Sequence, residues 1–144
     1  ESIPALDPLP DPTVLDTVEE DRFPAPGTTP RIADDTEHPH GYGLRPAEAA
    51  YFSNSAAFQT SVPDSRFTRK VIARFPSHRD DIPVSGYIKG ADLLEKKAAV
   101  VEFQVGKGRV ILIGFRPQHR AQTLRTFKLL FNSLYLPGLD REEL

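Results

Sequence analysis

The chain has 144 residues, of which 39% are hydrophobic and 26% are charged, and its formal net charge is −2. This length allows one domain of modest size and excludes a multidomain enzyme. The absence of Cys excludes disulfides, thiolate metal sites and cysteine nucleophiles. The charge and the lack of a basic stripe with interleaved aromatics argue against nucleic-acid binding. No apolar run approaches the roughly 18 residues of a membrane-spanning helix, and a start at Glu1 without Met suggests a processed or excised piece.

Residues 1–36 are predicted to form an extended, Pro-rich, acidic arm. Nine of the 14 prolines fall within residues 1–46, and each proline removes a backbone donor and favours extended geometry at the preceding residue. Acidic side chains outnumber basic ones in this opening, whereas the rest of the chain is net positive. Apolar residues recur along the arm, so we expect it to lie on the surface of a domain formed by residues 37–144.

A β-hairpin is the strongest pattern in the second half of the chain. Residues 98–105 alternate, which predicts a half-exposed strand with Glu102 on its exposed face. The glycines of residues 106–108 suit a tight connection. Residues 109–115 contain a continuous apolar run at 110–113, which predicts a strand that is buried on both faces. Residues 67–75 predict a further strand upstream of the hairpin.

Residues 123–136 predict an amphipathic helix, because their apolar side chains fall at helical spacing and Pro137 follows. A buried strand followed by such a helix is typical of α/β proteins. The expected core side chains of the hairpin and the helix are Ile111, Ile113, Phe127 and Phe131.

Three segments carry a resemblance to a known family: residues 100–136 (VVEFQVGKGRVILIGFRPQHRAQTLRTFKLLFNSLYL), residues 37–44 (EHPHGYGL) and residues 85–90 (SGYIKG). Together they resemble the C-terminal domain appended to secreted bacterial zinc carboxypeptidase-like proteins, a domain similar in fold to class I glutamine amidotransferases. The resemblance implies a partial or degenerate amidotransferase-like (flavodoxin-like) α/β sheet with a C-terminal β-hairpin and a packed C-terminal helix. It also implies a secreted or periplasmic accessory or interaction domain whose partner is a protein, either a missing catalytic domain or another subunit.

The residues that the chemistry of these families requires are missing from the sequence. An amidotransferase needs a Cys nucleophile, and no serine here stands in a G-x-S-x-G turn. Zinc carboxypeptidases use a His-x-x-Glu pair, for which His78 with Asp81 is the nearest approach. We therefore expect no catalytic residue, cofactor or metal ion in this chain.

Two clusters remain as candidate sites. Arg116, His119 and Arg120 lie between a strand end and a helix start, where ligands often bind in open α/β sheets, so they predict an anion or partner-carboxylate site. The alternative is that the arginines bond loop carbonyls and the acidic arm. The weaker candidate is the His-x-His pair of His38 and His40, which could ligate a metal only if another carboxylate or histidine converged on it.

Two other functions stay open at this point. The chain could be a hydrolase that uses Glu37, His38 or His119, or it could be a sugar-binding or oligomerisation module. A large flat apolar patch would favour oligomerisation. Sugar binding would be favoured by an exposed cleft lined by aromatic side chains, for which the candidates are Tyr42, Tyr51, Phe52 and Tyr87.

Overall fold

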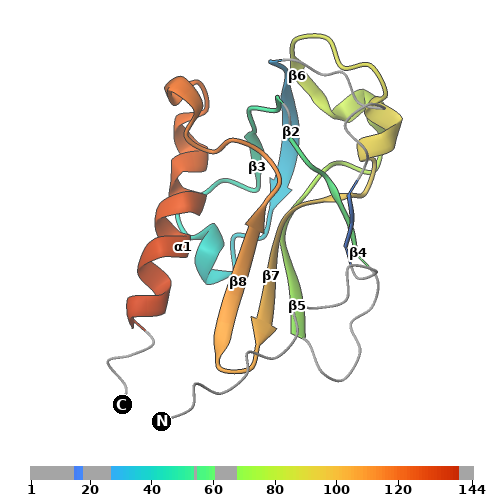
Figure 1. Cartoon of the computed structure of the whole chain (residues 1–144). Helices are drawn as coiled ribbons and strands as arrows, with labels where there is room; N and C mark the ends of the chain where they lie inside the picture. Colours follow the sequence, from blue (N-terminus) through green and yellow to red (C-terminus); the bar gives the residue numbers. More distant parts are fainter. Residues whose placement is uncertain (1–14, 18–26, 54, 61–67, 140–144) are drawn as a thin grey trace.

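The computed structural model describes residues 15–17, 27–53, 55–60 and 68–139 (Figure 1). One helix, α1 (Phe127–Leu139), follows eight strands. The strands are β1 (Leu15–Thr17), β2 (Thr29–Asp34), β3 (Ala47–Ala49), β4 (Phe58–Thr60), β5 (Thr68–Arg74), β6 (Pro83–Ser85), β7 (Ala98–Val105) and β8 (Gly108–Ile113). Short 3₁₀ turns lie at Pro39–Gly41, Arg79–Asp81, Ala91–Leu94, His119–Ala121 and Leu124–Thr126.

The strands form one sheet in the order β1-β4-β7-β5-β2-β3, with β6 paired to β2 and β8 paired to β7. The predicted hairpin is confirmed as β7 and β8, whose register runs from Val100 opposite Ile113 to Val105 opposite Gly108. A mixed α and β composition with a C-terminal helix is therefore confirmed. All pairings among the described strands are antiparallel. A flavodoxin-like sheet is parallel, so the finer fold assignment is not confirmed.

Strand β7 is the centre of the sheet and is buried on both faces. It pairs with β5 along one side and with β4 and β8 along the other. On one face Val100 packs in the cluster that contains Ile72 and Leu129. On the other face Val101 and Phe103 form a second cluster. The predicted alternation is therefore present, but both faces of the strand are covered.

Strand β8 is not buried on both faces, so this prediction is wrong. Among the described strands it pairs only with β7 and therefore lies at an edge of the sheet. Val110 is 43% exposed, while Ile111 and Ile113 are partly buried against the main core. A continuous apolar run does not distinguish a central strand from an edge strand, because both present side chains to two faces.

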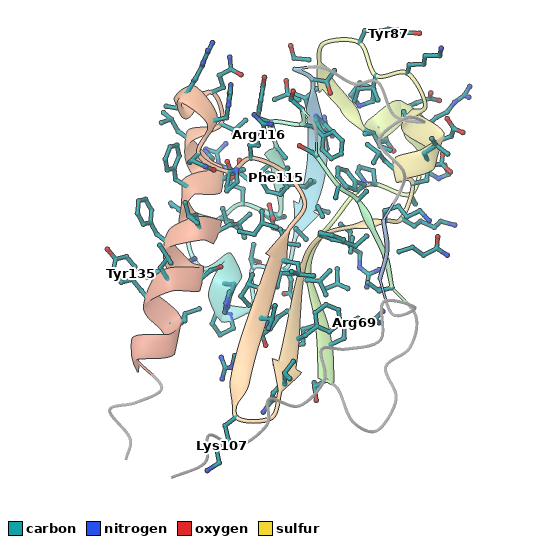
Figure 2. All side chains as sticks on the ribbon, in the orientation of Figure 1. Arg69, Tyr87, Lys107, Phe115, Arg116 and Tyr135 are labelled. Atoms are coloured by element: carbon teal, nitrogen blue, oxygen red, sulfur yellow. The ribbon has the colours of Figure 1, made fainter. Side chains whose placement is uncertain are left out.

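Helix α1 differs from its prediction in its start, its end and its buried face. It follows the separate Leu124–Thr126 turn and continues through Pro137 to Leu139, although a proline inside a helix removes one backbone hydrogen bond. Phe131 was predicted to be buried but is 45% exposed, whereas Leu129 is 1% exposed. The rings of Phe127, Phe131 and Tyr135 stack in series along the helix, and Figure 2 shows Tyr135 pointing away from the sheet.

Most of the predicted arm lies outside the described residues. Two of its segments, β1 and β2, are strands of the sheet: β1 pairs with β4, and β2 lies between β5 and β3. None of the helices in the described part of the chain has the length and apolar character needed to cross a bilayer.

Candidate functional site

The loop of residues 38–43, which we call the histidine loop, is a tight turn held beside helix α1 (the cyan coil in Figure 1). Pro39 begins its 3₁₀ turn, and the backbone N–H of His40 donates to Nδ1 of His38 at 3.3 Å. The turn also needs Gly41, because a Cβ on that residue would lie 2.0 Å from the carbonyl oxygen of Asp35. The turn therefore constrains the backbone that carries both histidines.

Glu102 is the functional residue that sequence reasoning misplaced. It lies on β7 opposite Lys70 of β5 and Ile111 of β8. The alternation predicted an exposed side chain, but Glu102 is only 6% exposed. Its face of β7 is covered by the histidine loop, which contacts α1 on its outer side. No local pattern in the sequence could show this cover, since the loop is some 60 residues away.

His38, His40 and Glu102 converge on one point. Oε2 of Glu102 lies 3.7 Å from Nδ1 of His40 and 3.9 Å from Nε2 of His38. One ligand-type atom from each of the three residues lies within 4.8 Å of the other two. Both distances exceed those of hydrogen bonds. The group meets the condition set for the His-x-His pair, namely that a carboxylate converges on it.

The cluster is buried and polar. The side chains of His38, His40 and Glu102 are 8%, 2% and 8% exposed. Among the described residues, no group hydrogen-bonds Oε2 of Glu102. A buried carboxylate oxygen without such a bond is costly. Oε2 of Glu102 is therefore a buried acceptor that needs a stabilising partner, such as a cation.

Burial lowers the pKa of His38 below its ordinary value, so the imidazole is neutral at pH 7. Glu102 and Asp35 act against this shift, while the positive charges of Lys70 and Arg109 add to it. Neutral imidazole is the form that ligates metal ions. Two imidazoles and one carboxylate are ligands that zinc and other divalent transition metals accept.

The predicted anion site is less organised. Arg116, His119 and Arg120 lie together on the loop between β8 and α1, as expected. The ring of His119 stacks on Tyr51 with centroids 4.2 Å apart. Both arginines are exposed, and neither makes an ion pair with another described residue. The strand before this loop is an antiparallel edge strand, so the crevice of a parallel sheet is not formed here. The anion site stays a prediction.

The structure separates some of the residues named for the hydrolase and the sugar-binding alternatives, and oligomerisation stays a prediction. Glu37 is exposed, and His119 stacks on Tyr51 in a different loop from His38. Phe52 is 2% exposed and packs edge-on against Phe75 in the core, so it cannot line a sugar-binding cleft.

No model of a protein family, no curated protein and no solved structure matches this chain. The resemblance to the carboxypeptidase-associated domain therefore stays a prediction.

Proposed function

We propose that this chain is a metal-binding domain that holds one zinc ion between His38, His40 and Glu102. The observation that carries the proposal is the convergence of these three side chains in a buried position. The two histidines come from one turn, and the carboxylate comes from the central strand of the sheet. A bound ion would therefore link the histidine loop to β7.

The separations between the ligand atoms suit a single small ion. Zinc bonds of about 2.0 to 2.2 Å in a tetrahedral arrangement place two ligand atoms roughly 3.3 to 3.5 Å apart. The observed distances from Glu102 to the two imidazoles are 3.7 and 3.9 Å. The three ligand atoms lie within 4.8 Å of one another, so movements of up to about 1 Å would bring them to tetrahedral separations. Bound zinc would also neutralise the Glu102 carboxylate.

The competing explanation is a histidine–glutamate pair without metal. In that case a ring N–H of a histidine would donate to Glu102. The observed separations of 3.7 and 3.9 Å are too long for such a bond, and the lowered pKa of His38 disfavours an imidazolium at neutral pH. Small side-chain movements would close either arrangement, so a measurement of zinc binding distinguishes the metal site from the pair without metal.

Zinc binding is tested by titrating the chain, without an affinity tag, by isothermal calorimetry and by measuring metal content after dialysis. We expect one zinc ion per chain. His38→Ala and His40→Ala should each abolish binding, and Glu102→Gln should weaken it, because the amide keeps the shape and loses the charge.

The chain offers a matched control, since it has only four histidines. The double variant His78→Ala/His119→Ala removes the two histidines that lie outside the cluster and should bind zinc like the wild type. The proposal fails if wild-type chain takes up no zinc, or if binding depends on His78 and His119 instead.

A second function is favoured by a different observation. The accessory or interaction role that the resemblance implies is supported by the outer face of α1, where Phe131, Leu134 and Tyr135 are 45%, 65% and 69% exposed. Aromatic side chains are enriched in the cores of protein interfaces. Phe131→Ser/Tyr135→Ser should weaken association with a zinc carboxypeptidase-like catalytic domain, whereas Val84→Ser/Tyr87→Ser, at exposed positions elsewhere, should not. If the wild type does not associate with that domain, this second proposal fails.

A further inference from the structure

Helix α1 holds the histidine loop from the side opposite to the metal ligands. Nδ2 of Asn132 donates to the carbonyl oxygens of His40 and Tyr42 at 2.8 and 3.1 Å. One turn earlier in the helix, Nζ of Lys128 donates to the carbonyl oxygen of Gly43 at 2.5 Å. These bonds use the backbone of the loop and not its imidazole rings.

Few residues at the start of helix α1 are buried against the rest of the domain. Leu129 is buried in the core, and the adjacent Thr126 bonds the carbonyl oxygen of Pro117 at 2.8 Å. Beyond these residues, Phe131 and Tyr135 face outward. The contacts with the histidine loop are therefore a large part of what holds the middle of α1 in place.

We infer that Asn132 is a positioning residue for the metal site, and that zinc binding and the docking of helix α1 stabilise each other. The inference rests on the proposed metal function. Zinc would fix the inner side of the loop to β7 through His38, His40 and Glu102, and Asn132 fixes the outer side of the same loop to α1. Both events select one loop conformation, so each must raise the equilibrium constant of the other by the same factor.

The consequence is that zinc controls how firmly the exposed face of α1 is presented. Without zinc, the helix keeps its bonds from Asn132 and Lys128 to the loop, but no metal links the loop to β7. With zinc, the loop would be held in one conformation, and residues 128–132 of the helix would bind to it more firmly. The stacked rings of Phe127, Phe131 and Tyr135 move as part of this helix.

Hydrogen exchange on the wild-type chain tests this coupling without any substitution. Zinc should slow exchange of the backbone amides of residues 129–136 at least about fivefold, the lower end of usual coupling between sites. The same addition of zinc to His38→Ala should leave these amides unchanged. The amides of β4, which pairs with β1 and meets β7 at Ala98 rather than at Glu102, provide an internal reference.

The reciprocal measurement uses Asn132→Ala. This variant should bind zinc at least about fivefold more weakly than the wild type, measured against a competing chelator. Ser133→Ala is the matched control, because among the described residues Oγ of Ser133 donates to the carbonyl oxygen of Leu129 within the same helix. A merely structural role for Asn132 would lower the melting temperature of the metal-free chain and leave the zinc affinity unchanged.

The two proposals fail in different ways. If the wild type binds zinc but the exchange of α1 does not respond and Asn132→Ala keeps full affinity, the coupling is wrong and the metal site stands. If the wild type binds no zinc, the metal site itself is wrong. Should Asn132→Ala not fold, the exchange experiment on the wild type still decides the coupling.

Discussion

Asp34, at the end of β2, is the most strongly perturbed acid among the described residues. Both of its carboxylate oxygens are buried without a hydrogen bond from another described residue. Burial raises the pKa of Asp34 from 3.8 to about 7, and the nearby charge of Glu48 adds to this effect. The folded chain therefore binds this proton more tightly than the unfolded chain, so stability must fall as the pH rises from about 4 to 7.

We expect Asp34→Asn to remove this pH dependence. Between pH 4 and pH 8 the variant should gain up to about 4 kcal/mol in free energy of unfolding relative to the wild type, since each pKa unit corresponds to about 1.4 kcal/mol. Urea denaturation at both pH values measures the change. Burying the amide also changes the free energy of unfolding, by an amount that does not vary with pH. Asp80→Asn, on an exposed turn, is the control, and a pH-independent difference for Asp34→Asn would contradict the assignment.

Leu129 and Phe131 are two apolar residues of α1 with opposite surroundings. Leu129 is 1% exposed and Phe131 is 45% exposed. Leu129→Ala should lower the free energy of unfolding by roughly 2 to 5 kcal/mol, because it leaves a cavity. Phe131→Ala should cost less than about 1 kcal/mol, although it removes more atoms. Equal losses in chemical denaturation would mean that the buried face of the helix is misassigned.

The two ring nitrogens of His38 report directly on metal binding. Nδ1 accepts the backbone N–H of His40, which places the proton of the neutral ring on Nε2. Nε2 also faces Glu102. A zinc ion on Nε2 needs the lone pair of that nitrogen, so the ring proton must move to Nδ1 and the bond from the backbone N–H of His40 to Nδ1 must break. Nitrogen NMR of the imidazole should show the change of tautomer on adding zinc, and an unchanged tautomer would exclude ligation through Nε2.

Among the elements of the fold, the histidine loop should tolerate substitution least. A Cβ on Gly41 would lie 2.0 Å from a backbone oxygen, whereas a Cβ on Gly108 would lie 3.6 Å from its nearest neighbour. Gly41→Ala should therefore displace the loop, lower the free energy of unfolding by roughly 1 to 3 kcal/mol and weaken zinc binding. Gly108→Ala, in the β7–β8 connection, should change neither by a comparable amount. Thermal denaturation and zinc titration of both variants check this.

Strands and helices with strong local patterns could be predicted from the sequence. Which of their faces are buried, and against which elements, could not. The β7–β8 hairpin follows from alternation and two glycines, and β5 follows from its composition. Whether β8 is central or at an edge depends on strands elsewhere in the chain. The buried face of α1 depends in the same way on which residues meet the core. Helical spacing fits two different faces of the helix, one that contains Phe131 and one that contains Leu129.

In the candidate site, too, the local motif could be predicted from the sequence and the long-range contacts could not. The His-x-His pair was visible in the sequence, and the requirement for a third ligand could be stated. Glu102 was not identified, because in a strand that alternates polar and apolar residues a carboxylate is usually exposed to solvent. Its burial arises from the pairing of β7 with β5 and β8 and from the cover of a distant loop. These are long-range contacts that no window of sequence contains.

On the scale of the whole molecule, zinc would act as a cross-link between the histidine loop, which contacts α1, and the central strand. Any ligand that binds only the folded state raises its stability, by about 2.7 kcal/mol when the free ligand is at 100 times its dissociation constant. Zinc at that excess should raise the melting temperature of the wild type by several degrees and leave that of His40→Ala unchanged. A rise of equal size in both chains would place the binding elsewhere.

The most direct test of the account is a crystal structure of the zinc-loaded chain with anomalous diffraction collected on both sides of the zinc absorption edge. The account predicts a single strong peak bonded at about 2.0 to 2.2 Å to one nitrogen each of His38 and His40 and to a carboxylate oxygen of Glu102. A peak located instead at His78, His119 or the acidic surface, or no peak in crystals grown with excess zinc, would contradict it.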